Sequence, residues 1–488
     1  MAMNDELGEK LLQKKESLRK RVWEESKKIW VVAGPAIFTK FSTFSTYIIT
    51  QAFIGHFVGS TELAAYALVM ITLCRFITGI LLGMASALET LCGQAYGAKQ
   101  YNMLGVFLQR SWIVLFFTTI LLLPLYIFTT PILEAFGQKK EIAQVGGTIA
   151  LWAIGPTFAM AVSFTCQTFL QAQSKNVIIT YLAAFSLAIH VLLSWLLTVK
   201  FEFGLNGAMM SLVLGLWLPN IGQIIFIMKK CPETWKGFSI LAFKDLWPVV
   251  KQSFSSGIML CLEVWYSSIL VLLTGNMKDA EVSLSAMSIC LNINGWEMMI
   301  ALGFFAAASV RVANELGRGS SRDAKFSIVI NALTSFAIGF IFFLIFLFLK
   351  KKLSYIFTSD SDVANAVGDL SFWLALSMLL NSVQPVLSGV SVGAGWQSIV
   401  AYVNIGCYYL IGIPVGVVIG VVYNLGIKGI WIGMLFGTFV QTIMLIIITT
   451  KTDWDKQVEI AQWRVNRWAI NNAQESNGSG TSLLANQE

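Results

Sequence analysis

Long apolar stretches recur along almost the whole chain, separated by short polar segments. Most run for about 20 residues or more, the length at which a helix crosses a hydrocarbon core of roughly 30 Å. A transmembrane barrel would need alternating segments of about 10 residues, and the run from Phe336 to Leu349 does not alternate. The pattern predicts an all-α integral membrane protein with twelve helices, near residues 29–55, 63–92, 107–134, 145–170, 177–199, 207–228, 250–275, 283–310, 326–349, 364–391, 398–421 and 430–450.

The composition agrees with this interpretation. Hydrophobic residues make up 56% of the 488 positions and charged residues only 12%, whereas soluble domains carry roughly a quarter charged residues. A chain of this kind cannot cover a water-soluble surface. The first 28 residues are charged and contain no apolar core of the signal-peptide type, so we expect no cleaved leader and a first anchor that begins near Ile29.

Basic residues are distributed unevenly between the predicted loops. They gather in the tail before residue 29, in the segment from Lys229 to Lys251 and after Lys451, all on one predicted side of the membrane. Because cytosolic loops carry the excess of Lys and Arg, both termini are predicted to be cytosolic, which requires an even number of spans. The net charge of +7 is then a topology signal, and no nucleic-acid partner is needed to explain it.

An internal repeat divides the chain into two halves. At an offset of about 220 residues, Gly83 and Gly97 oppose Gly303 and Gly317, and the segment that begins at Phe203 opposes the one that begins at Leu425. Six spans per half give both halves the same orientation, so we expect two six-helix lobes related by a pseudo-two-fold axis along the membrane normal, with a cleft between them. The predicted divisions are a tail (1–28), an N-lobe (29–240), a C-lobe (241–455) and a second tail (456–488).

The second tail begins with an amphipathic repeat. Apolar residues recur at helical spacing, with basic residues between them, and predict a helix at the membrane interface: Trp454, Val458, Ala461, Val465 and Trp468. The stretch from Asn471 to Glu488 is polar and is predicted to be disordered. The seven Cys have no metal-binding or redox spacing, and the two His lie far apart, so we expect neither disulfides nor a metal site.

Glu263 is the first candidate for chemistry because it lies near the middle of a predicted span, with no Lys or Arg within a helical turn. An ionisable side chain at that depth costs about 2.5 to 3.5 kcal/mol, so its presence needs a reason. One reason is reversible uptake of a proton; the other is a neutral acid that makes a structural hydrogen bond between helices. Glu89 and Glu297 lie near predicted helix ends or small residues, which favours the structural reading for both.

Other residues could line the cleft or bend its walls. Lys40 could face the cleft, snorkel or pair with a carboxylate. Trp265, Tyr266 and Trp296 could stack on flat ligands, although aromatic residues at helical spacing are more often simply packed. Pro35 and Pro385 each remove a helical hydrogen bond, which makes them candidate hinges as well as tolerated packing features.

Two stretches carry a resemblance to a known family. Residues 82–99 (LGMASALETLCGQAYGAK) and 311–319 (RVANELGRG) are similar to plant members of the multidrug and toxic compound extrusion (MATE) family. The resemblance implies proton-coupled antiport of organic compounds out of the cytosol, into the vacuole or the apoplast, with Glu263 as the coupling carboxylate. It also implies a monomer in the vacuolar or plasma membrane that takes small-molecule substrates, contacts membrane lipids and needs no cofactor other than the proton gradient.

The sequence departs from the family pattern at two places. Many relatives have an Asp where Asn381 stands, just before Gln384, and prokaryotic relatives often carry an Asp on the first helix, where residues 37–54 contain no acid. The missing carboxylates make a sodium site less plausible. With Lys40, they favour neutral or anionic phenolics over cationic alkaloids, and the Asn381 form resembles the branch associated with flavonoid glycosides and vacuolar loading.

Two other classes of function are alternatives to the transporter. A lipid or oligosaccharide flippase of the same superfamily would have similar spans but a more cationic cavity for phosphates, which Glu263 without a basic cluster does not suggest. A receptor or an intramembrane enzyme is the second alternative. No Ser/His pair, Asp pair or metal-ligand pattern is visible at membrane depth, so the chain is predicted not to be an enzyme.

Overall fold

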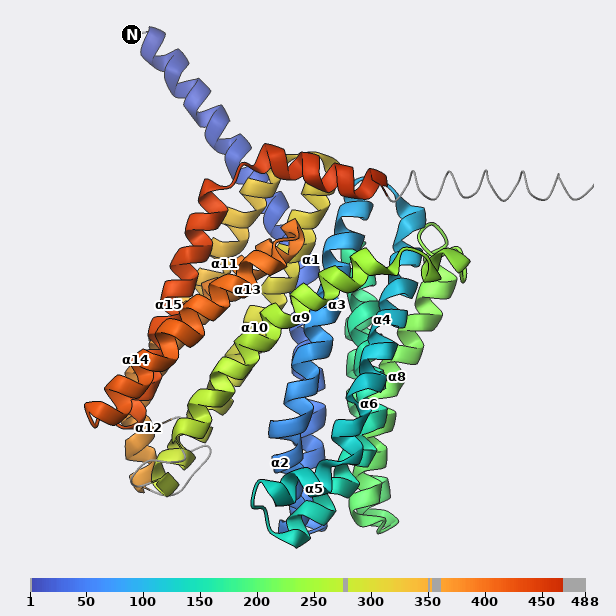
Figure 1. The fold of residues 1–488 in the computed structure, drawn as a ribbon. Helices are drawn as coiled ribbons and strands as arrows, with labels where there is room; N and C mark the ends of the chain where they lie inside the picture. The colour runs from blue at the N-terminus through green and yellow to red at the C-terminus, as the bar shows by residue number, and fades with distance from the viewer. Residues whose placement is uncertain (1, 275–279, 350–351, 353–360, 468–488) are drawn as a thin grey trace, which may run out of the picture.

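The computed structural model describes residues 2–274, 280–349, 352 and 361–467, and these residues form helices joined by short turns (Figure 1). The helices of the N-lobe are α1 (Ala2–Phe57), α2 (Ser60–Val69), α3 (Arg75–Gly97), α4 (Tyr101–Ile127), α5 (Thr129–Ala135), α6 (Lys140–Ala172), α7 (Val177–Ser194) and α8 (Gly204–Lys230). Those of the C-lobe are α9 (Leu246–Thr274), α10 (Ala280–Arg318), α11 (Ser321–Leu349), α12 (Ser361–Ala394), α13 (Gln397–Asn404), α14 (Ile413–Val417) and α15 (Ile427–Lys451).

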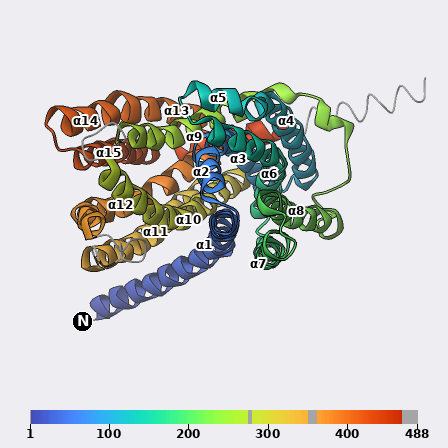
Figure 2. The same ribbon diagram turned by 90° about the horizontal axis from the view of Figure 1, so that it is seen from below.

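These helices make twelve transmembrane spans, six in each lobe. Ten described segments are long and apolar enough to cross a membrane, and α1 and α9 complete the set. Some spans are assembled from pieces: π-helical turns at Met70–Cys74 and Ile405–Gly412 join α2 to α3 and α13 to α14. The two lobes lie side by side, with α1 near the boundary between them (Figure 2).

The lobes approach each other at one end of the molecule, here called the terminal side because α1 begins and the chain after α15 lies there, and they diverge toward the opposite side (Figure 1). Small residues permit the approach. A Cβ atom on Gly97 would collide with the main-chain oxygen of Asn314, and one on Gly317 would collide with that of Gln94. Because both positions lie on the α3–α10 crossing, glycine at each lets the two lobes pack backbone to backbone.

Helix α1 belongs to both lobes. Near the terminal side, Ile29, Val32 and Ala33 are fully buried in a cluster built mainly from α10, α11 and α12 of the C-lobe. Farther along, Ser42 donates to the main-chain oxygen of Ala183, and Thr50 lies 3.2 Å from the ring of His190, both on α7 of the N-lobe. The change of partner occurs around Pro35, so this proline lies where α1 passes from one lobe to the other.

The hydrogen bond that Pro35 removes is replaced by a side chain of the N-lobe. Without an amide hydrogen, Pro35 cannot donate to the carbonyl of Val31. The side-chain amide of Asn176, fully buried before α7, lies 3.3 Å from that carbonyl and 3.4 Å from that of Val32. Asn176 therefore fastens the N-lobe to the part of α1 that packs on the C-lobe.

A buried ion network ties α1 to α10 on the terminal side. Arg311 forms two hydrogen bonds to the carboxylate of Glu25, at 2.7 and 2.9 Å, and a third to Glu315 at 2.6 Å. Burial works against the charge of Glu25, but its hydrogen bond and attraction to Arg311 hold the pKa of that carboxyl below its usual value. The two carboxylates and the guanidinium depend on one another, because none of them reaches water freely.

Residues 454–467 form a helix that lies across the terminal side (Figure 1). Its apolar residues Trp454, Ala461 and Val465 are buried against the protein. Arg464 donates to Gln94 of α3 at 2.8 Å, while Trp396, between α12 and α13, donates to Gln457 at 3.0 Å. The amphipathic repeat thus has a packing partner within the protein and contacts both lobes. Trp468 and the predicted polar tail from Asn471 to Glu488 lie outside the described residues.

Arg311→Met should strongly destabilise the protein, because the substitution leaves the buried carboxylates of Glu25 and Glu315 only the exposed cations Lys28 and Arg318, at 3.6 and 3.1 Å. Breaking a buried pair costs about 3 to 5 kcal/mol, whereas an exposed pair is worth at most about 1 kcal/mol. The measurement is the midpoint of thermal unfolding of the purified protein. The control is Lys428→Gln, which breaks the exposed ion pair between Lys428 and Asp369. Equal shifts in the two variants would contradict the importance of the buried network.

Arg464→Met should loosen residues 454–467, because it removes the hydrogen bond to Gln94. Hydrogen bonds of charged groups contribute roughly 1.5 to 3 kcal/mol, so amide exchange in this helix should accelerate by about tenfold or more. Hydrogen–deuterium exchange read by mass spectrometry measures this. Arg467→Met, on an exposed residue of the same helix, is the matched control and should leave the exchange rates close to those of the wild type.

Candidate functional site

Glu263 on α9 faces α12 of its own lobe. Its Oε1 accepts a hydrogen bond of 2.8 Å from the side-chain amide of Gln384, which also donates to the hydroxyl of Ser388 at 3.1 Å. Gln384 is buried, so this amide is held in place. The other carboxyl oxygen of Glu263 is buried and has no hydrogen-bond partner among the described residues. A carboxyl in this setting has one fixed donor and one free oxygen that can carry a proton.

A second carboxyl lies close to α12. Glu297 on α10 is buried and lies beside Asn381, whose amide also donates to Asn294 at 3.0 Å. Asn381 and Gln384 are three residues apart on α12, so they lie on neighbouring positions of one helix face. The site in the C-lobe therefore consists of two carboxyls from α9 and α10, each supported by an amide from α12.

Pro385 places a flexible point in the wall of this site. It follows Gln384 directly and is buried on α12. Because it has no amide hydrogen, it cannot make the helical hydrogen bond to the carbonyl of Asn381. The predicted hinge residue thus adjoins both amides that support the carboxyls, and a bend in α12 would move them relative to Glu263 and Glu297.

Lys40 and Glu89 occupy a separate place at the lobe boundary. The Lys40 ammonium lies 5.3 Å from the centre of the Phe164 ring, which supports a cation–π contact. Glu89 on α3 attracts this ammonium and lies beside Ser309 of α10. One carboxyl oxygen of Glu89 is buried and has no hydrogen-bond partner among the described residues. Glu89 therefore shares the features of the other two buried acids, whereas its sequence position favoured a structural role.

Trp265 and Trp296 both bridge the lobes. Trp265 of α9 stacks on Phe76 of α3 with ring centres 4.9 Å apart, and its indole nitrogen has no partner in the described part of the chain. Trp296 of α10 packs against Phe41 and Phe44 of α1, at 5.3 and 5.0 Å. These stacks occupy ring faces that a flat ligand would use, so a ligand that stacks there must displace an aromatic neighbour.

Tyr266 is buried on α9, three residues after Glu263, and packs against other parts of the C-lobe. Only 3% of its surface is exposed, its hydroxyl donates to the main-chain oxygen of Gly433 at 3.1 Å, and its ring stacks on Tyr408. Residues three apart are neighbours on a helix surface, so Tyr266 and Glu263 lie close together on α9. Tyr266 is a core residue of this lobe.

The sequence did not single out two polar residues that matter here. Asn294 lies three residues before Glu297, a spacing that places both on one helix face, and this signal could have found it. Asn176 supports Pro35 from more than a hundred residues away, and nothing in its local sequence indicates that contact. No group of three His, Cys, Asp or Glu side chains able to hold a metal ion occurs among the residues with described positions.

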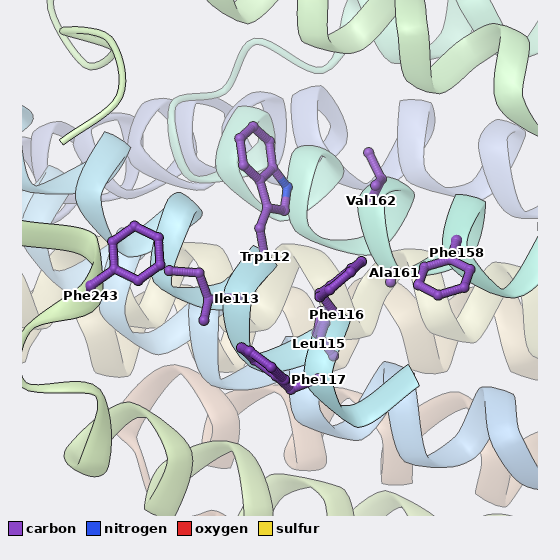
Figure 3. A pocket seen from close by; sticks show the side chains of 9 residues that line it. All are labelled: Trp112, Ile113, Leu115, Phe116, Phe117, Phe158, Ala161, Val162 and Phe243. Carbon is purple, nitrogen blue, oxygen red and sulfur yellow. The ribbon is translucent and has the colours of Figure 1, made fainter. Parts of the chain in front are cut away.

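A cavity of about 400 Å³ lies on the outer side of the N-lobe and is a different feature from the site above. Its walls come from α4, α6 and the segment before α9 (Figure 3). The lining is apolar, with Phe116, Phe117 and Phe243 well exposed. Its lining offers almost no polar groups to orient a ligand, so it lacks the features of a specific small-molecule site.

Comparisons with known proteins agree with one another. The family model described as MatE matches residues 35–196 and 256–418, one block in each half. Protein DETOXIFICATION 21 of Arabidopsis thaliana is 60% identical over 97% of this chain and 94% of its own length, and Protein DETOXIFICATION 23 of the same plant is 62% identical over 92% and 91%.

Among solved structures, the crystal structure of the eukaryotic MATE transporter AtDTX14 matches with a TM-score of 0.85 at 33% identity, covering 91% of this chain and 99% of that one. The crystal structure of the Vibrio cholerae MATE transporter VcmN in the bent form matches with a TM-score of 0.77 at 15% identity, covering 92% and 99%, which shows the shared fold alone. The protein is a membrane transporter of two six-helix lobes, not an enzyme, and it belongs to the MatE family of multidrug and toxic compound extrusion transporters.

Proposed function

We propose that this protein is a proton-coupled antiporter that moves organic compounds out of the cytosol. Support comes above all from Glu263, a carboxyl at membrane depth with one fixed amide donor and one free oxygen. The terminal side carries the basic tail and linker and would face the cytosol. The opposite side would open to the vacuole or the apoplast, with the vacuolar membrane as the preferred location.

The coupling cycle follows from the different needs of the two protonation states. An ionised Glu263 in a low-dielectric cleft needs polar partners, whereas the neutral acid does not. In the cytosol-facing state the carboxyl releases its proton and helps receive the substrate. In the opposite state the carboxylate takes up a proton from the acidic compartment. The neutral acid no longer needs polar partners, and the substrate is released. Each protonation state thereby favours its own arrangement of helices.

The terminal-side contacts are the ones that such a cycle must break. The structure is closed there by the α3–α10 glycine crossing and by residues 454–467, which contact both lobes. In the cytosol-facing state these contacts would separate. Pro35, where α1 changes lobes, and Pro385, beside the C-lobe site, are the hinges that we propose for this movement.

The charges near the cleft favour neutral or anionic aromatic substrates. Asn381 stands where an acid would add negative charge beside Glu297, and Lys40 contributes a positive charge at the lobe boundary. Trp265 and Trp296 supply flat surfaces once their stacked neighbours move. We therefore propose plant phenolics, flavonoid glycosides among them, as the substrate class, and a monomer as the working unit.

A flippase is the alternative within the same superfamily, and the two differ in their prediction for phosphate groups. A phosphate-binding cavity needs a cluster of cations. Around Glu263 and Glu297 the described hydrogen-bond partners are the uncharged side chains of Gln384 and Asn381. This arrangement supports exchange of a small organic substrate for protons rather than transport of a phosphorylated lipid.

Glu263→Gln should abolish substrate accumulation driven by a pH gradient, because the amide mimics a permanently protonated acid. With one proton per substrate, a difference of one pH unit can sustain about tenfold accumulation, since it is worth about 1.36 kcal/mol. The variant should equilibrate substrate without accumulating it. Uptake of a labelled flavonoid glycoside into vesicles at imposed pH differences measures this.

The control for that experiment is Glu134→Gln, the same chemical change on an exposed residue of α5. Protein abundance in the vesicles must be equal in the wild type and both variants. Normal gradient-driven uptake by Glu263→Gln at equal abundance would refute the coupling role of Glu263. Glu89 and Glu297, whose carboxyls also have an oxygen without a partner among the described residues, would then be the next candidates.

Asn381→Asp should improve transport of cationic substrates relative to neutral ones while transport remains driven by protons. The substitution places a negative charge one helical turn from Gln384 and beside Glu297. An opposite charge within a few ångströms contributes about 1 to 4 kcal/mol at intermediate dielectric, enough to alter preference by at least several-fold. Competition between a cationic and a neutral substrate in vesicles tests this. An unchanged preference would show that Asn381 does not face the substrate.

A further inference from the structure

A cavity of about 390 Å³ lies between α1 and the start of α11 on the terminal side. It is lined by Arg21, Ser321, Arg322, Lys325, Phe326 and Val329. Three of these six residues are cations from two different helices, and two are apolar. The lining of the cavity is therefore partly basic and partly apolar. This combination suits an amphipathic ligand with a negatively charged headgroup.

The positive charge of this cavity is only partly balanced. Arg21 lies 3.5 Å from the carboxylate of Asp323, and its guanidinium is 4.7 Å from the centre of the Phe326 ring. Arg322 and Lys325 are exposed, and neither forms an ion pair with a described residue. Two cations thus remain for a ligand, next to the beginning of a helix, where the macrodipole also favours negative charge.

An apolar stripe continues from the cavity along α11. Val329, Leu333, Phe336 and Phe340 follow one another at spacings of three and four residues, which places them on one face of the helix. Between 41% and 59% of the surface of each is exposed. The stripe runs from the charged end of α11 into the membrane span, so it lies where an acyl chain would extend below a headgroup bound in the cavity.

We propose that this cavity binds the headgroup of an anionic phospholipid, with an acyl chain along the Val329–Phe340 face of α11. Basic pockets between transmembrane helices at the cytosolic surface are suited to anionic headgroups. A solvated basic surface would explain Arg322 and Lys325 alone, but neither the contribution of Arg21 from a second helix nor the apolar residues Phe326 and Val329 in the same hollow. Free phosphate has the same charged group as the lipid headgroup, but it would make no contact with the apolar stripe on α11.

The bound lipid would also strengthen the terminal-side contacts. Arg21 lies one helical turn before Glu25, which holds Arg311 in the buried network. A headgroup held jointly by Arg21 of α1 and by Arg322 and Lys325 of α11 connects the same two helices at the membrane surface. The anionic lipid should therefore raise the thermal unfolding midpoint as well as bind.

The experiment measures binding of phosphatidylglycerol to the purified full-length protein in nanodiscs of phosphatidylcholine. Neutralisation of both free cations in the double variant Arg322→Gln/Lys325→Gln should weaken binding by about 25-fold, since each cation near the surface contributes about fivefold. The matched control is Lys229→Gln/Lys230→Gln, which removes the same charge from exposed residues at the end of α8 and should stay within about twofold of the wild type. Arg322→Lys/Lys325→Arg keeps the charge and should retain binding.

Two outcomes would overturn the proposal. Equal losses in the two double glutamine variants would show that the lipid responds to general surface charge. Displacement of phosphatidylglycerol by glycerol 3-phosphate at the same concentration would show a site for a soluble phosphate rather than a lipid. In support, phosphatidylglycerol should raise the thermal unfolding midpoint of the wild type and of Lys229→Gln/Lys230→Gln. It should not raise that of Arg322→Gln/Lys325→Gln. The unfolding midpoint of this last variant in phosphatidylcholine alone shows whether it is folded.

Discussion

A carboxyl group deep in a membrane protein must either find donors or take up a proton, and this constraint governs the architecture of the transporter. Glu263 has one donor, Gln384, and one free oxygen; Glu297 and Glu89 have a similar free oxygen. A fully satisfied carboxylate would keep its charge through the whole cycle, and one with no partner would stay neutral. In the proposed coupling cycle, a single fixed amide would leave the two protonation states to be selected by a change of environment.

Helix α1 makes the change of environment possible because it is shared by both lobes. Its first part packs with α10 and its later part with α7, and Pro35 stands at the transition. A proline in a helix leaves a carbonyl without a donor, which is costly in a low-dielectric interior. Asn176 supplies the donor from the N-lobe. The position in α1 where a helical hydrogen bond is missing is therefore bonded to the N-lobe.

The sequence predicted the features that depend on composition and local spacing. Twelve spans and two similar lobes follow from apolar length and a shared offset, whereas the coupling role of Glu263, inferred from the cost of a buried charge, stays a prediction. Long-range contacts could not be predicted in this way. The contacts of Tyr266 are one example, because local spacing does not reveal that its hydroxyl reaches α15. Likewise, the bonds from Arg311 to Glu25 and from Asn176 to Val31 join residues far apart in the chain, and no local pattern marks either.

The closed side of the molecule is held by polar contacts and glycine packing, beside the buried side chains of Trp454, Ala461 and Val465, and the proposed cycle would open it. A large apolar interface would gain free energy in proportion to its area and would resist separation. Hydrogen bonds such as the one from Arg464 to Gln94 exchange with water at modest net cost when the lobes part. The glycine crossing at Gly97 and Gly317 brings the backbones close without interlocking side chains. Contacts of this kind can hold the two lobes in one specific geometry and still separate reversibly, as the proposed alternating access requires.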